Sequence, residues 1–418
     1  MADAGPDRAR SLTTGSSVTV AVAVMNVTAY AFTIVAARWL GPSEFGAVGA
    51  LMGVLLVLNV AGLGLQTTGA RRVSRAQGDI TPIARQVMTV TYATAVGLGL
   101  ATLLVSPLLN AALGLDSLPT AALLAVTVFL QTVFFGQAGV IQGERRWGPL
   151  AFIYALNGAG RLVAGLATMA VRPDALGAML GVALGALAPV VVGTWAMRSD
   201  RSLVPVPRGA VRGMWGELGR NARALLAFLG VANADMIVAR LALSPHDSGL
   251  YAGGLILAKA VLFLPQFVIV LGFPTMAAGG AARDRNHLRA VALLVVLGLG
   301  AVAGAAVLPG LALQFVGGEQ YAEIEELLWL FAVLGLALSL VQFLVYDAVA
   351  RQDHPAVLAV WAALVLLSAS ALVVESVTGL LLWAVTVDSV LAVTLLALSF
   401  ARSPAGNPVR APETPPAQ

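Results

Sequence analysis

Four charged residues lie inside long apolar stretches of the sequence, where ionised side chains are rare. Arg161 and Lys259, the only lysine in the chain, are cations, whereas Asp235 and Asp388 are anions. A charge at the centre of a bilayer costs roughly 2.5–3.5 kcal/mol, so each needs a partner or a water-filled cavity. Arginine binds phosphate through a planar fork of donors, and lysine does so through a compact, movable ammonium group. The two cations are therefore suited to holding an anionic ligand.

Other polar residues occur at helical spacing beside the two cations. Tyr154 and Asn157 precede Arg161 by seven and four residues, and Gln266 follows Lys259 by seven. This spacing places each set on one face of a helix. We expect these faces to line a shared hydrated cavity; the alternative is hydrogen bonding between helices, worth about 0.6 kcal/mol per contact. The predicted substrate-binding residues are Asn26, Tyr154, Asn157, Arg161, Lys259 and Gln266.

The two carboxylates allow more than one interpretation. Asp235 and Lys259 lie at similar depths on either side of a short turn, so they could form a structural salt bridge. Alternatively, Lys259 contacts the substrate and pairs with Asp235 in only one state. Asp388 has no cationic neighbour in the sequence, and a lone intramembrane carboxylate can hold a proton or a sodium ion or be a protonated structural residue. Asp235 and Asp388 are the predicted ion-coupling residues.

The composition indicates which elements must position these residues. The chain is 59% hydrophobic and 11% charged, whereas about a quarter of the residues in soluble domains are charged. Its mean hydropathy is +0.88. Apolar stretches of roughly 20 residues, long enough to span a bilayer, recur along its length. This predicts an all-α integral membrane protein with twelve transmembrane helices. The predicted spans are 17–37, 46–67, 87–108, 119–141, 149–171, 175–197, 223–243, 249–273, 288–308, 327–347, 355–374 and 379–400.

The distribution of arginine and lysine predicts the orientation of these helices. Of the 25 basic residues, 20 lie in or beside segments on the side of the N-terminus, and only Arg38, Arg172 and Arg240 lie on the other side. Because cytoplasmic loops are enriched in basic residues, both termini are expected to be cytoplasmic. The polar N-terminus has no small-residue cleavage signature, so we expect the first helix to be retained. The arginine-rich, lysine-poor composition suggests GC-rich bacterial coding, and hence the bacterial plasma membrane.

An internal repeat divides the chain into two halves. The segment ARWLGPSEFGAVGA (37–50) matches ARLALSPHDSGLYAGG (239–254), so that Arg38 corresponds to Arg240 and Gly46 to Gly249. Two halves of six helices with equal orientation predict a pseudo-twofold axis along the membrane normal, around a central cavity. The expected organisation is a cytoplasmic tail (1–16), an N-terminal six-helix lobe (17–197), a basic cytoplasmic linker (198–222), a C-terminal six-helix lobe (223–400) and a disordered cytoplasmic tail (401–418).

The turns of this repeat also resemble those of a known family. The motifs ARWLGPSEFG, QGERRWG, NADMIVARLALSPHDSGLYAGG and FVGGEQYAE, in this order, are similar to those of polysaccharide flippases of the multidrug/oligosaccharidyl-lipid/polysaccharide exporter superfamily. This resemblance implies a V-shaped pair of six-helix lobes that carries a lipid-linked oligosaccharide, of the undecaprenyl pyrophosphate type, across the membrane by alternating access. It implies membrane lipids and polysaccharide assembly proteins as partners, and H⁺ or Na⁺ as a coupling ion.

Several other functions compete with this interpretation. A multidrug or metabolite exporter of the same superfamily, an integral membrane enzyme of envelope polysaccharide assembly and a non-transporting scaffold are the alternatives. Because the sole lysine is not in a phosphate-binding glycine loop, we expect no ATP hydrolysis and no cofactor. The three histidines, His246, His287 and His354, lack metal-ligand spacing, so no metal site is expected. The net charge of +4 is explained by topology, and we expect no nucleic-acid partner, no catalytic residue and no enzymatic activity.

Overall fold

All the regular secondary structure that the computed structural model describes is helical. It describes residues 6–197, 208–263, 281–351 and 353–401. The α-helices are α1 (Pro6–Arg75), α2 (Thr81–Ala112), α3 (Leu118–Gly143), α4 (Trp147–Val171), α5 (Ala175–Ala196), α6 (Arg208–Ala242), α7 (Pro245–Leu262), α9 (Ala281–Val307), α10 (Pro309–Val316), α11 (Leu328–Ala350), α12 (His354–Ala369) and α13 (Val377–Ala401). Two 3₁₀-helices are η1 (Glu319–Leu327) and η2 (Ser370–Leu372).

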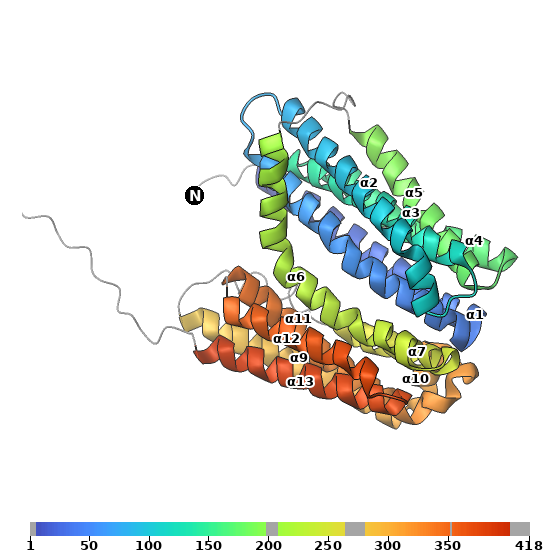
Figure 1. Ribbon diagram of the computed structural model, residues 1–418. Helices are drawn as coiled ribbons and strands as arrows, with labels where there is room; N and C mark the ends of the chain where they lie inside the picture. Colours follow the sequence, from blue (N-terminus) through green and yellow to red (C-terminus); the bar gives the residue numbers. More distant parts are fainter. Residues whose placement is uncertain (1–5, 198–207, 264–280, 352, 402–418) are drawn as a thin grey trace, which may run out of the picture.

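The helices form two bundles that meet at one end of the molecule. Helices α1–α5 pack together as one bundle, here named the N-lobe, and the elements from α6 to α13 form the other, here named the C-lobe. Helix α1 contacts both α6 and α7, so it joins the two lobes. The lobes converge near α7 and α10 and diverge toward the side that bears the N-terminus (Figure 1). This arrangement agrees with the V shape expected from the resemblance.

Ten described helices are long and apolar enough to cross a membrane. The first, α1, covers the first two predicted spans and is kinked at Gly41, where φ is 71° and ψ is 172°. Glycine tolerates this positive φ, and the following Pro42 has no N–H for the helical ladder, so the Gly-Pro pair breaks the helix. The eighth predicted span, 249–273, is described only as far as residue 263. The chain is a multi-pass membrane protein, and the count of twelve spans stays a prediction.

Two helices begin before the spans that the sequence predicts. Helix α6 begins at Arg208, so residues 208–222 of the predicted linker are helical and continuous with the seventh span. The reason is that prolines at 205 and 207 disfavour helix before them, whereas the residues that follow include alanine, leucine and arginine, which favour it. Helix α1 likewise begins at Pro6, within the predicted tail. The predicted C-terminal tail lies outside the described residues except for the end of α13.

Glycines in α4 and α5 bring the backbones of the N-lobe close together. A Cβ on Gly158 would lie 2.6 Å from the Cα of Met25 in α1, and a Cβ on Gly185 in α5 would lie 2.6 Å from the Cα of Arg161. Small residues allow this approach of helices in membranes. Helix α4 is thereby held between α1 and α5, which fixes the position of the Arg161 backbone.

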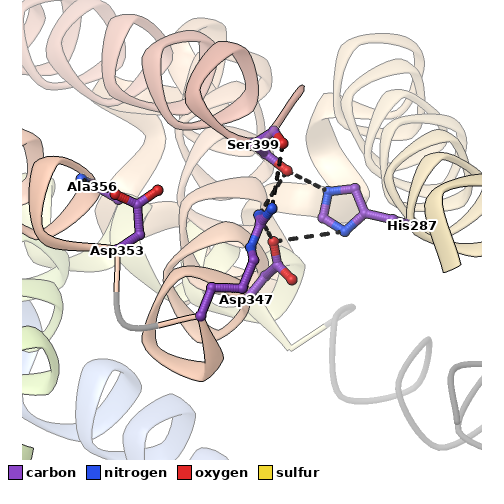
Figure 2. A network of polar contacts seen from close by, with 6 residues as sticks. His287, Asp347, Asp353, Ala356 and Ser399 are labelled. Carbon is purple, nitrogen blue, oxygen red and sulfur yellow. Dashed lines mark hydrogen bonds and ion pairs between the residues drawn. The ribbon is translucent and has the colours of Figure 1, made fainter. Parts of the chain in front are cut away.

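A polar network holds three helices of the C-lobe together near the end of α13 (Figure 2). Arg351 at the end of α11 forms an ion pair with Asp347 and donates to the hydroxyl of Ser399 in α13 at 2.8 Å. His287 in α9 lies with Nδ1 3.9 Å from Asp347 and Nε2 3.3 Å from the Ser399 hydroxyl. Beside it, Asp353 caps α12 by accepting from the N–H of Ala356. The network stabilises the C-lobe and lies apart from the cavity described next.

Candidate substrate cavity

A cavity of about 400 Å³ lies between the two lobes. Helices α1, α3 and α4 form its N-lobe wall, and α6, α7 and α11 form its C-lobe wall. Five of the six predicted substrate-binding residues line it: Asn26, Tyr154, Asn157, Arg161 and Lys259. The sixth, Gln266, lies outside the described residues. The helical spacing of the polar residues in the sequence therefore identified one wall of the cavity on α4 and one residue of the other wall on α7.

Arg161 contributes a cation to the N-lobe wall. Its side chain is half-buried and lines the cavity, and no hydrogen bond or ion pair to any described residue satisfies its guanidinium group. An arginine that lies within the membrane and has no protein partner must keep its charge in water or bind an anion. The cavity is the place where either can occur.

Lys259 contributes a second cation, from the C-lobe wall. Its Nζ donates a hydrogen bond of 3.1 Å to Oδ1 of Asn233 in α6. Among the described residues it forms no direct ion pair with Asp235, the partner that the sequence allowed. The amide is neutral, and the carboxylate of Asp235 attracts the ammonium group from beyond ion-pair distance. The ammonium is therefore positioned at the cavity wall with its charge only partly compensated by the protein.

Side-chain amides form much of the remaining polar lining. In the N-lobe, Gln131 donates to Oδ1 of Asn157 at 3.2 Å, and Asn157 donates to the sulfur of Met25 at 3.8 Å. Asn59 and Gln342 each have a buried side-chain oxygen without a described hydrogen-bond partner. Unlike ionised groups, amides both donate and accept, so they can bind the hydroxyl groups of an uncharged polar ligand. Four of the lining amides were not predicted from the sequence as binding residues: Asn59, Gln131, Asn233 and Gln342.

Aromatic rings lie beside these amides on the N-lobe wall. The rings of Phe134 and Tyr154 meet edge to face with centroids 5.8 Å apart, and Phe135 lies 5.3 Å from Phe134. The hydroxyl of Tyr154 accepts a hydrogen bond from Gln66. Residues 154, 157 and 161 therefore present a ring, an amide and a cation along one face of α4.

The charge of the lining is of one sign. Arg161 and Lys259 are its ionisable cations, and none of the described residues that line the cavity is an aspartate or a glutamate. In the low-dielectric interior of a membrane, such a cavity favours anions and disfavours cations. This imbalance is the strongest chemical feature of the site.

Asp235 and Asp388 lie behind the cavity wall, within the C-lobe. Asp235 is 3% exposed; its Oδ2 accepts from the hydroxyl of Tyr251 at 3.0 Å and its Oδ1 accepts from the N–H of Met236. Asp388 is 2% exposed, and its Oδ1 has no hydrogen-bond partner among the described residues. The two carboxyl groups are close enough to interact electrostatically. Two buried carboxyl groups that repel one another need a compensating cation or proton, and Lys259 supplies part of this compensation to Asp235.

Comparisons with known proteins agree with this architecture. The chain superposes on an inward-facing multidrug resistance MATE family transporter of the MOP superfamily with a TM-score of 0.74 and 14% identity, covering 91% of this chain and 94% of that one. On an outward-facing transporter of the same description it superposes with a TM-score of 0.61 and 15% identity, covering 93% of this chain and 94% of that one. On a MOP superfamily transporter from Pyrococcus furiosus it superposes with a TM-score of 0.55 and 13% identity, again covering 93% of this chain and 94% of that one. All three are transporters by description, and at 13–15% identity the likeness is one of fold.

The sequence itself identifies the family. A comparison with curated proteins found no match. In contrast, residues 35–326, which are more than half of the chain, match the family described as polysaccharide biosynthesis protein. The resemblance inferred from the turn motifs is thereby confirmed. The chain belongs to the polysaccharide biosynthesis protein family and has the fold of the transporters of the MOP superfamily.

Proposed function

We propose that this protein is a flippase that moves a lipid-linked oligosaccharide of the undecaprenyl pyrophosphate type from the inner to the outer leaflet of the bacterial plasma membrane. The observation that carries the proposal is the cavity lined by Arg161 and Lys259 without a described carboxylate. The family description, polysaccharide biosynthesis protein, is consistent with such a substrate, whose headgroup is an anionic pyrophosphate joined to a hydroxyl-rich sugar.

The two halves of this headgroup match two kinds of lining residue. Arg161 and Lys259, one from each lobe, bind the pyrophosphate through charge-assisted hydrogen bonds, which are about twice as strong as neutral ones. Asn26, Asn157 and the neighbouring amides bind sugar hydroxyls, and Tyr154 packs against the sugar ring. The polyprenyl chain stays in the bilayer, so a cavity of about 400 Å³ has to hold only part of the ligand at a time.

The proposed direction of transport follows from the orientation of the lobes. They diverge toward the side of the N-terminus (Figure 1), which the positive-inside rule assigns to the cytoplasm. The TM-score is also higher for the inward-facing relative than for the outward-facing one, 0.74 against 0.61. Both observations support the proposal that the described conformation receives substrate from the cytoplasmic leaflet, with both termini in the cytoplasm.

Asp235 and Asp388 provide the proposed coupling site for H⁺ or Na⁺. Their burial and mutual repulsion make the pair responsive to a cation that enters between them. Asp235 is two residues from Asn233, which in turn holds Lys259. A cation bound at the carboxyl groups would thus affect the position of Lys259, the proposed substrate-binding cation, through one short segment of α6.

An exporter of cationic drugs is the main alternative, because two of the relatives are multidrug transporters by description. The charge of the cavity disfavours it, since a cationic drug would face two cations and no described carboxylate.

Translocation in reconstituted vesicles tests the proposal. The purified protein is inserted in liposomes with a fluorescent polyprenyl pyrophosphate oligosaccharide, and the fraction of headgroups protected from an external quencher is followed with time. We expect faster equilibration between leaflets than in protein-free liposomes, and competition by unlabelled carrier but not by a cationic dye. A protein that moves the cationic dye and not the lipid-linked sugar would instead be a drug exporter.

A further inference from the structure

At their convergent end the lobes are joined by Arg240, whose guanidinium group donates to several main-chain carbonyls of the N-lobe. Arg240, near the end of α6 in the C-lobe, is 8% exposed. Its Nε donates to the carbonyl of Leu113 at 2.7 Å and one terminal nitrogen donates to the carbonyl of Gly114 at 3.1 Å, both in the turn between α2 and α3 of the N-lobe. The other terminal nitrogen lies 3.3 Å from the carbonyl of Ser43 in α1. Three N-lobe carbonyls are thus held by one C-lobe side chain.

The repeat-related arginine makes the reciprocal contact. Arg38, which corresponds to Arg240 in the internal repeat, lies in α1 of the N-lobe and donates to the carbonyl of Gln314 in α10 of the C-lobe. Adding the same offset of 202 residues to Leu113 and Gly114, the residues that Arg240 contacts, gives positions 315 and 316, directly after Gln314. The two contacts thus lie at closely corresponding places in the internal repeat. They are unequal, because Arg38 is exposed and makes one such bond.

Other groups strengthen the closure around this pair. The side chain of Gln320 donates to the carbonyls of Ala37 and Arg38 at 2.9 and 3.0 Å, and the buried Tyr321 donates to that of Ala37 at 3.1 Å. The carboxylates of Glu44 and Asp116, both in the N-lobe, lie close enough to Arg240 to attract its charge.

We propose that Arg38 and Arg240 form a paired latch that holds the lobes closed at this end and must release before the cavity can open there. The proposal rests on the proposed function, because only a transporter that opens at both ends needs a releasable closure. Arg240 is suited to release: it also donates to the carbonyl of Pro245 and the hydroxyl of Ser248 in its own lobe. These bonds keep the guanidinium partly satisfied when the N-lobe moves away and water reaches it.

The test measures the distance between the lobes directly and needs no substrate. The chain has no cysteine, so Ala112→Cys on α2 and Ala322→Cys on η1, both exposed, provide a specific pair of spin-label sites. In lipid nanodiscs, pulsed electron resonance should give one short distance for the parent protein. Arg240→Ala should add a longer distance, with the ratio of open to closed molecules raised about tenfold or more, because three interlobe bonds to a charged donor are lost. Arg38→Ala should give a smaller rise.

Arg172→Ala is the matched control. Arg172 lies on the same side of the protein, but it pairs with Asp174 of its own lobe at 2.5 Å, so its loss should leave the distances unchanged. A folded Arg240→Ala protein with the parent distribution would overturn the proposal. If the Arg240→Ala protein does not fold, the Arg38→Ala protein provides the test, because Arg38 is exposed. An unchanged distance distribution for Arg38→Ala would then overturn the proposal. A flippase assay that fails while the distances shift as expected would reject the proposed substrate and not the latch.

Discussion

Gly46 and Gly249 lie in backbone contact across the junction of the two lobes. A Cβ on Gly46 would be 2.8 Å from the backbone nitrogen of Gly249, and a Cβ on Gly249 would be 1.8 Å from the carbonyl oxygen of Pro42. The two glycines also correspond to one another in the internal repeat. Equivalent residues that touch one another must lie beside any axis that relates them, so this contact is where the predicted pseudo-twofold axis would pass. Glycine is needed here because no side chain fits between the backbones.

Replacing Gly249 by alanine should therefore destabilise the protein. The added methyl group meets main chain, which cannot move aside as a flexible side chain can, and we expect the free energy of unfolding to fall by roughly 1–3 kcal/mol. This exceeds the gain of about 1 kcal/mol that alanine brings to a helix. Gly300→Ala in α9 is the control, because a Cβ there meets nothing within 4 Å. Thermal unfolding in detergent measures both; an unchanged Gly249→Ala midpoint would refute the close contact.

The orientation of the chain can be tested with single cysteines. Ala112→Cys should react with a membrane-impermeant thiol reagent on intact cells, since it lies on the side with few basic residues. Arg289 is exposed near the start of α9, on the side that is predicted to be cytoplasmic, so Arg289→Cys should react only after the cells are permeabilised. The reverse pattern would show that the termini lie outside the cell and would exclude the proposed direction of transport.

Asp388→Asn should uncouple transport from an ion gradient. The substitution removes the charge with little change in volume, so the site can no longer exchange a proton or a sodium ion. We expect the rate under an imposed gradient of H⁺ or Na⁺ to fall to the rate without one. Glu326→Gln, an exposed carboxylate in η1, is the control and should retain the response. If Asp388→Asn still responds fully to the gradient, the carboxyl group is structural.

The sequence predicted the repeat and the cavity wall on α4 because both depend on spacing within one helix or between homologous turns. It left the partner of Lys259 open, because depth along a helix does not fix rotation about the helix axis. Asn233 and Asp235 are two residues apart in α6 and so point in directions about 200° apart. Only the packing of α6 against α7 determines that Asn233 meets Lys259 while Asp235 faces Tyr251.

The unpredicted amides have a different explanation. Asn59 and Gln131 lie in long apolar stretches and have no charged residue at helical spacing from them. Such a residue can as readily bond to an adjacent helix as line a cavity. Their place in the cavity depends on the divergence of the two lobes, which no local pattern encodes.

The most direct test of the account is the translocation rate of the Lys259→Ala protein in liposomes with the fluorescent pyrophosphate-linked oligosaccharide. Loss of a charge-assisted bond to the headgroup should lower the rate about 10–100-fold. The protein should stay folded, because the only described bond lost is the one to Asn233, and Asp235, which loses the attraction of Lys259, keeps its bonds to Tyr251 and Met236. Lys259→Arg should recover part of the rate, and Arg289→Gln, an exposed cation outside the cavity, should have no effect. A Lys259→Ala protein that translocates the carrier at the parent rate would contradict the proposal that this cation binds the substrate.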